Sequence, residues 1–353
     1  MYVEPGYVLY VRDGVLLAQS FDAKTLSITG EPVQLTDEID FFGPTGTASF
    51  SASNEGTLVY RPRAGKSRLQ WLDREGRELE TLLKPDRYGR VRLSRDERKL
   101  AVTLANERTG TSDVWLVDLE RGIPTRFTTS PRTEFTPCWS PDGRRVAFSA
   151  DWDGPPNIYY QDVAGGEPTV LVPFDRKVQY AYDWTPDGEH VIYAHKNGSE
   201  QQDIWIVEVA TGERRKLVGT EFIESDPAVS PDGRWLAYVS TESGSPEVYV
   251  QAFDGTGQRV RVSVDTGFEP RWRRDGKELY YLTRSGHVMA AAVDVSSGLQ
   301  VDQAVPLFRL DRGTVRGYDV TADGQRFLVN LADAKTMTQA DRVDVGWTRV
   351  FDR

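Results

Sequence analysis

Acidic, aromatic and arginine residues occur in this sequence at corresponding places just ahead of a series of short β-rich segments. Carboxylates and tyrosines that lie close together can act as general acids and bases. The same residue types, with arginine, are typical of ligand pockets and protein interfaces, where aromatic rings and a few polar groups supply the contacts. The chemistry depends on whether the fold gathers them. The set consists of Glu134, Tyr180, Tyr182, Asp183, Glu224, Asp226, Glu269, Arg271, Arg316 and Tyr318.

A four-residue turn signal recurs at a regular spacing alongside these residues. Ser-Pro-Asp-Gly at 140–143 is followed by Thr-Pro-Asp-Gly at 185–188 and Ser-Pro-Asp-Gly at 230–233, so that successive aspartates lie 45 residues apart. In such a turn Pro presets the backbone, Asp bonds its own backbone and Gly permits a positive φ. Because the aspartate recurs from copy to copy, we interpret it as structural. Degenerate copies lie at Asn54-Glu55-Gly56, Arg95-Asp96-Glu97, Arg274-Asp275-Gly276 and Ala322-Asp323-Gly324.

A period of roughly 40–50 residues indicates a solenoid, a propeller or an array. Within one copy, β-rich runs at 144–148, 157–163 and 167–171 follow the short segment 137–139, with turn signals between them. Short strands without a helical period predict an all-β fold, and four strands per unit of this length are typical of a propeller blade. We therefore predict a single β-propeller of four-stranded antiparallel blades. The connection into each innermost strand would then rim one mouth of the central channel and bring the ten residues together.

The blade count follows from aligning the weaker copies with the clear ones. The first segment, 1–40, aligns with a late copy if residues 1–4 form a clipped innermost strand, and 343–347 would belong to the last copy. This alignment favours eight blades in one domain spanning 1–353, with seven blades as the alternative. The expected blades are 1–40, 41–85, 86–130, 131–175, 176–220, 221–264, 265–310 and 311–353.

The composition of the chain limits the classes of partner that it is expected to bind. The net charge is −10 and the basic residues are scattered, so the sequence shows no electrostatic footprint for nucleic acid. No window of eighteen apolar residues occurs, so this segment is not expected to insert into a membrane. Cys138 is the only cysteine and is expected to be a buried small hydrophobe, which leaves no disulfide and no cysteine-based metal site. We expect no cofactor, no metal and a monomer.

The repeats resemble the WD-like units of TolB-type propellers, because each turn leads into a β strand and then into a strand of the Asp-Ile-Trp kind, as at Asp203-Ile204-Trp205. The segments 6–14, 30–33, 230–240 and 270–279 also resemble the C-terminal propeller of bacterial receptor-like serine/threonine kinases. That resemblance implies the sensor part of a larger signalling protein on the periplasmic side of the membrane. Without such a context, the absence of a signal peptide and of a membrane span from the sequence would favour the cytoplasm.

The resemblance implies no phosphoryl transfer, because the Gly-rich loop, the His-Arg-Asp loop and the Asp-Phe-Gly motif of kinases are absent. A Gly-x-Ser-x-Gly elbow is absent too, and only three histidines are available for a catalytic triad. We therefore predict a non-enzymatic propeller that binds a protein or small ligand at one mouth of the ring. The alternative is a propeller hydrolase or lyase that uses the acidic and tyrosine residues at the mouth. A third interpretation is a purely structural array. The sequence leaves the ligand, the mouth and the compartment open.

Overall fold

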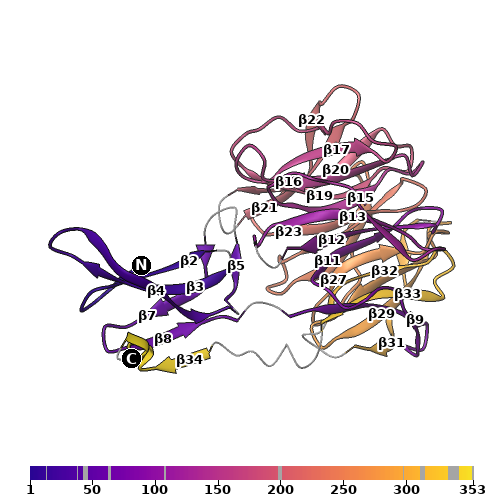
Figure 1. Cartoon of the computed structure of the whole chain (residues 1–353). Coiled ribbons are helices and arrows are strands. Elements are labelled where there is room, and N and C mark those ends of the chain that lie inside the picture. The colour runs from indigo at the N-terminus through magenta and orange to yellow at the C-terminus, as the bar shows by residue number, and fades with distance from the viewer. Residues whose placement is uncertain are drawn as a thin grey trace. The chain divides into compact units, whose positions relative to one another are not determined.

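The computed structural model describes residues 1–12, 14–37, 39–42, 47–62, 65–106, 109–197, 201–296, 298–310, 315–332 and 342–351. Asp13, which is part of the segment 6–14 named above, lies outside these residues. The regular structure of the described chain is almost entirely β, so the predicted fold class is confirmed. Two compact units are present, and Figure 1 shows the strands of both. One contains the described parts of Met1–Lys66, Ala105–Ser112 and Asp333–Arg353, and the other contains those of Ser67–Leu104 and Asp113–Ala332.

The larger unit consists of antiparallel sheets of the predicted four-stranded kind. In five of them the strands follow one another along the chain, and the innermost strand comes first. The first two of these sheets are β11 (Tyr88–Leu93), β12 (Lys99–Ala105), β13 (Ser112–Asp118) and β14 (Ile123–Arg126), and β15 (Glu134–Trp139), β16 (Arg145–Ala150), β17 (Asn157–Asp162) and β18 (Thr169–Val170). The next two are β19 (Val178–Trp184), β20 (His190–Asn197), β21 (Gln201–Glu208) and β22 (Arg214–Val218), and β23 (Glu224–Val229), β24 (Trp235–Ser240), β25 (Glu247–Ala252) and β26 (Val260–Arg261). The fifth is β27 (Phe268–Trp272), β28 (Glu278–Leu282), β29 (His287–Asp294) and β30 (Gln300–Val301), and β31 (Val305–Arg309) also pairs with β29.

The remaining sheet of this unit joins strands from opposite ends of the chain. Its order is β10 (Glu78–Thr81), β9 (Ser67–Asp73), β33 (Arg326–Ala332) and β32 (Val315–Val320). In the register of β9 and β33, Leu72 lies opposite Phe327 and Leu69 lies opposite Asn330. The ring is therefore closed by hydrogen bonds between an early strand and a late one.

The innermost strands contact one another in a cycle, from β11 through β15, β19, β23, β27 and β32 back to β11. The described residues of the larger unit thus form six blades. The expectation of eight blades, or of seven, in one domain over 1–353 differs from this arrangement. Segments 86–130, 131–175, 176–220, 221–264 and 265–310 each contain one blade, whereas 41–85 and 311–353 contribute to one shared sheet.

The smaller unit contains the other strands that were expected to form the first, second and last blades. The sheet β1 (Tyr2–Val3), β2 (Tyr7–Arg12), β3 (Val15–Asp22) and β4 (Ser27–Thr36) resembles a blade in its strand order but belongs to a separate core with Leu9, Leu16 and Trp347. The second sheet joins β7 (Phe50–Ala52), β8 (Thr57–Tyr60) and β34 (Arg342–Val345), beside the short pair β5 (Phe41–Phe42) and β6 (Thr47–Ala48). Within the stretch 343–347, residues 343–345 therefore pair with β8 and not with a last blade, and Trp347 begins the 3₁₀ helix η2 (Trp347–Phe351).

The repeated turns confirm the structural role of their aspartates. Ser140 donates its hydroxyl hydrogen to Asp142 at 2.6 Å, and Asp142 also accepts from the amide of Arg144 at 3.0 Å. The hydrogen bond from Ser140 lowers the pKa of Asp142, with a further contribution from the Arg144 amide. Gly143 has φ 68°, the left-handed conformation that the turn requires. The same bonds recur at Thr185 and Asp187, Ser230 and Asp232, and Thr321 and Asp323.

Candidate functional site

Each innermost strand carries an irregularity that turns side chains toward the channel. The register of the pairs β15–β16, β23–β24 and β27–β28 shifts at a bulge. Thr136, Asp226 and Glu269 occupy these bulges with φ between 48° and 50°. Residues other than glycine adopt this conformation at a cost, and such strain is typical of functional sites. The bulges therefore place polar side chains from several blades at one level of the channel.

A cluster of paired charges forms at this level. Arg90 of β11 donates to Asp226 of β23 at 3.1 Å, and its guanidinium lies 4.5 Å from the ring centre of Tyr182 of β19. Glu269 of β27 pairs with Arg271 at 3.3 Å, and Tyr318 of β32 donates its hydroxyl to the Glu269 carbonyl oxygen at 3.0 Å. Residues from five blades thus meet in the channel, and we call them the bulge cluster.

Burial raises the pKa of the two tyrosines of the bulge cluster. It raises the pKa of Tyr182, and the neighbouring carboxylate of Asp226 adds to the rise. Burial likewise raises the pKa of Tyr318 well above its usual value. Both phenols therefore stay protonated at neutral pH, where they can donate hydrogen bonds but cannot act as bases.

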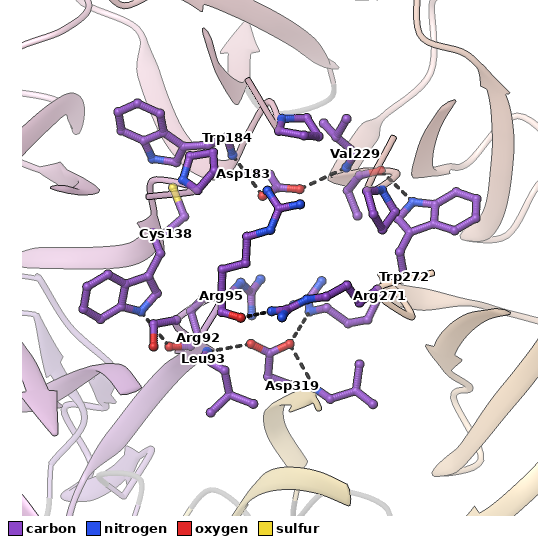
Figure 2. A pocket seen from close by; sticks show the side chains of 18 of the residues that line it. Arg92, Leu93, Arg95, Cys138, Asp183, Trp184, Val229, Arg271, Trp272 and Asp319 are labelled. Atoms are coloured by element: carbon purple, nitrogen blue, oxygen red, sulfur yellow. Dashed lines mark hydrogen bonds and ion pairs between the residues drawn. The ribbon is translucent and has the colours of Figure 1, made fainter. Parts of the chain in front are cut away.

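One or two residues further along the innermost strands, a second layer of side chains lines a cavity of about 230 Å³. Figure 2 shows Arg92, Arg271 and Asp319 together on one side of this pocket and Asp183 on the opposite side. Arg92 and Arg271 are nine-tenths buried or more, with 9% and 8% of their surface exposed. Cys138 lines the same cavity and is 2% exposed, and burial raises the pKa of its thiol, which confirms its prediction as a buried residue.

The second layer also holds the blades together. Asp183 accepts from the amide of Val229 on the next blade at 2.9 Å, and Asp319 accepts from the amide of Leu93 at 2.7 Å. A tryptophan links another pair of neighbouring blades, because the Trp139 indole of β15 donates to the Arg92 carbonyl oxygen of β11 at 3.0 Å. The two acids are therefore bound to backbone groups of neighbouring blades.

The structure brings six of the ten predicted residues together in the bulge cluster and the second layer, and the other four belong to neither. Tyr180 lies at the start of β19 with its ring 5.7 Å from that of Phe135. Arg316 lies in β32, where burial and the nearby Arg87 lower its pKa. The six that converge are Tyr182, Asp183, Asp226, Glu269, Arg271 and Tyr318.

Glu134 and Glu224 lie away from this cluster and are fully buried. Glu134 accepts from the Trp152 indole, and Glu224 accepts from the Thr220 hydroxyl at 2.5 Å. Both precede the bulge of their strand. Since a bulge shifts the alternation of side chains, residues on its two sides do not continue the same face. These two carboxylates therefore tie loops to their blades and do not contribute to the channel.

Glu134 gives a pH-dependent prediction for folding. Burial raises its pKa to about 7, against about 4.3 for an unfolded chain. The stability associated with the protonated group is thus complete below pH 4.3 and is lost as the pH rises through 7. Because Gln does not titrate and keeps an acceptor for Trp152, we expect Glu134→Gln to be more stable than the parent by about 1–2 kcal/mol at pH 8 and by little at pH 4.

Urea unfolding of both proteins at pH 4, 6 and 8 measures this difference. Glu167→Gln, a change of the same kind at an exposed position, serves as the control and should show no such trend. A constant difference between Glu134→Gln and the parent at all three pH values would contradict the raised pKa.

Sequence reasoning missed Arg90 and Arg92. Their copy carries the degenerate turn Arg95-Asp96-Glu97, so its connection was not included in the rim. The available signal was the offset from the turn: Arg92 precedes Asp96 by four residues, as Asp183 precedes Asp187.

Among the described residues, one group could bring three metal ligands together: Asp187, Glu189 and His190, whose ligand atoms lie within 4.8 Å of one another. Asp187 already accepts hydrogen bonds from Thr185 and from the Glu189 amide in its turn. The exposed group thus has a structural role, and no other observation indicates an ion.

A family profile described as TolB beta propeller domain matches residues 84–200 and 175–303, which together make up more than half of the sequence. The chain belongs to the TolB β-propeller family. The matched region lies within the blades that line the channel, and the predicted TolB-type resemblance is confirmed. The narrower resemblance to kinase propellers stays a prediction. No helix in the described part of this TolB-family chain has the length and apolar character needed to span a bilayer.

Two curated relatives and one solved structure illustrate the similarity. The chain is 28% identical over 159 residues to the TolB homolog of Chlorobium luteolum, a match that covers 44% of this chain and 35% of that protein. It is 27% identical over 164 residues to the uncharacterized peptidase YuxL of Bacillus subtilis, covering 36% and 25%. The matches thus span about a quarter to a third of the relatives' length.

A solved structure assigned as TolB, from Agrobacterium tumefaciens, superposes with a TM-score of 0.63 at 20% identity, over 76% of this chain and 99% of that chain. The hydrazine synthase structure of Kuenenia stuttgartiensis superposes with a TM-score of 0.53 at 16% identity. At such identities the likeness shows the propeller fold alone, since unrelated functions share this architecture.

Proposed function

We propose that this TolB-family propeller is a non-enzymatic binding domain that captures a protein segment or a small ligand at the mouth of its channel beside the bulge cluster. The observation that carries the proposal is the convergence of Arg90, Tyr182, Asp226, Glu269 and Tyr318 from five blades. Binding sites combine aromatic surface with a few polar groups placed in this manner. Propeller scaffolds commonly present such residues around one axis.

The wider context is also proposed. The resemblance of segments such as 230–240 to kinase-linked propellers supports a role as the sensor part of a larger bacterial signalling protein, with the propeller on the periplasmic side. The domain would act as a monomer and bind no nucleic acid, in keeping with the net charge of −10 and the scattered basic residues.

The alternative is a propeller hydrolase or lyase that uses channel acids and tyrosines. The observation in its favour is the peptidase name of the Bacillus subtilis relative, in a match that covers 25% of that protein. Against it, burial raises the pKa of Tyr182 and Tyr318, which disfavours either phenolate as a general base and leaves the two phenols the role of acid. The convergence of aromatic and polar groups from five blades favours binding.

The test is a screen for binding partners of the full chain. A displayed peptide library and a collection of bacterial metabolites would be offered to the parent protein and to Tyr182→Ala. We expect ligands whose affinity falls about tenfold or more in the variant, as for an aromatic residue at the centre of an interface. Asp162→Asn, an exposed change on an outer strand, is the control and should bind as the parent does.

Two results would contradict the proposal. Ligands that bind equally well to the parent and to Tyr182→Ala would place binding elsewhere. A compound that is chemically converted by the parent and not by Tyr182→Ala would favour the enzymatic alternative.

A further inference from the structure

The cavity lined by the second layer offers binding groups in addition to those of the bulge cluster beside it. All six blades contribute to its walls through the ends of their innermost strands and the turns that follow. Three tryptophans, Trp139, Trp184 and Trp272, form apolar parts of the wall. The cavity volume of about 230 Å³ is several times the roughly 30 Å³ that one water molecule occupies in the liquid. It is smaller than the roughly 300–1,000 Å³ of pockets that bind drug-sized ligands. It therefore has room for a small molecule or a single headgroup.

The carboxylates around this cavity are engaged by the backbone. Asp183 accepts from the amides of Trp184 and Val229, both at 2.9 Å. Asp319 accepts from the amides of Leu93 and Val320 at 2.7 and 3.0 Å. Glu97, at the edge of the cavity, accepts from the amide of Ala322. Their hydrogen-bonding capacity is thus directed to the blades and away from a cation in the cavity.

Of the two buried arginines of the cavity, Arg92 is less completely paired than Arg271, which also donates to the Pro270 carbonyl oxygen at 2.6 Å. Arg92 donates one hydrogen bond, to the Val91 carbonyl oxygen at 2.7 Å, and no carboxylate of the described residues lies within ion-pair distance of it. Burial lowers the pKa of Arg92 to about 9, and the charges of Arg271 and Arg90 add to this effect. Arg271 pairs with Glu269 at 3.3 Å, while its Nε lies 3.8 Å from Asp319 without a hydrogen bond. Arg92 is thus a buried guanidinium with no carboxylate at ion-pair distance, and the carboxylates of Asp319 and Glu269 act on it only from further away.

We propose that the cavity binds a small oxyanion, either a carboxylate or a phosphate group, between Arg92 and Arg271. The planar guanidinium presents paired N–H donors that match either group, and the low-dielectric site strengthens the interaction. Arg95 and Arg274, which are exposed and line the same cavity, supply further positive charge at its entrance. Figure 2 shows the side chain of Arg95 extending over the pocket.

The inference deepens the proposed function by naming a charge class for a ligand in the same channel. The two remain separable, because anion binding depends on Arg92 and is measured with simple salts. Peptide or metabolite capture depends on Tyr182 and is measured with libraries. Either can fail while the other holds.

The experiment measures the thermal unfolding midpoint of the full chain in chloride at constant ionic strength, with phosphate or acetate replacing chloride. We expect a saturable rise of roughly 2–4 °C with half-saturation at millimolar concentration or below, since an anion that binds only the folded state stabilises it. A response to phosphate alone assigns a tetrahedral group, and a response to acetate alone assigns a carboxylate.

The decisive variant is Arg92→Met, which keeps the unbranched apolar stem and removes the charge. It should lose the anion-dependent rise, and its midpoint in chloride should equal or exceed that of the parent, because a buried charge without an ion-pair partner has been removed. The control Arg98→Met, at an exposed position, should respond as the parent does. If Arg92→Met does not fold, Arg92→Lys, which keeps the charge and lacks the paired donors, should raise the half-saturating concentration several-fold.

The proposal is overturned by the absence of a saturable rise in the parent, or by a rise that follows ionic strength and not the identity of the anion. It is also overturned if Arg92→Met, or Arg92→Lys where Met does not fold, responds as the parent does.

Discussion

Replacing Leu69 with Asp is expected to prevent the larger unit from folding. Leu69 lies in β9, the strand that closes the ring, and is fully buried against Val91, Leu100 and Leu328. A carboxylate at this position would lose its hydration without gaining a partner, which costs more than about 4 kcal/mol. Because β9 joins β10 to β33, the loss falls on the sheet that completes the cycle of blades. The expected result is insoluble protein or the loss of the cooperative transition in circular dichroism and tryptophan fluorescence.

The matched control is Leu79→Asp. Leu79 lies in β10 of the same sheet with 50% of its surface exposed, so the new charge stays in water. We expect an unfolding free energy within about 0.5 kcal/mol of the parent. Cooperative unfolding of Leu69→Asp near the midpoint of Leu79→Asp would show that the closing sheet does not support the ring.

Asp183→Asn is expected to lower stability by about 2–4 kcal/mol, although it is nearly isosteric. Both carboxylate oxygens of Asp183 accept backbone amides, one from Trp184 and one from Val229 of the next blade. An asparagine offers one oxygen, and its amide nitrogen would face an N–H group that has no other partner. The loss of this acceptor leaves a desolvated N–H donor at the interface between two blades. The midpoint should fall by roughly 5–10 °C.

Thermal unfolding of Asp183→Asn beside Asp162→Asn tests this account. Asp162 is exposed at the end of β17, so the same substitution there should change the midpoint by little. Equal midpoints for the two variants would mean that the bond to Val229 does not link the blades.

The turn signals predicted most of the blades, because each combines local turn chemistry with the strands beside it. Asp142, Asp187 and Asp232 lie in equivalent turns, as their spacing indicated. The expected eight or seven blades differ from the six that the described residues form in the ring, for two physical reasons. Segment 1–40 has the strand grammar of a blade but packs in its own core, and the pairing of β9 with β33 joins residues that no local pattern connects.

The predicted channel residues show the same division between local and non-local information. Asp226 and Glu269 were found because they precede a recognisable strand, and the bulges aim them into the channel. Glu134 and Glu224 precede their strands too, but lie on the other side of the bulge, whose position the sequence does not mark. Arg92 was missed because the turn that follows it has lost its Pro and Gly.

The mixed closing sheet has a consequence for synthesis of the chain. The strand β9 leaves the ribosome about 250 residues before β33, its hydrogen-bonding partner. At roughly 5–20 residues per second, this edge waits on the order of 10–50 s, during which it can pair with other nascent chains. Translation pauses placed after residue 81 would lengthen the wait, whereas faster elongation or a chaperone that covers the 67–73 segment would raise the yield of native protein.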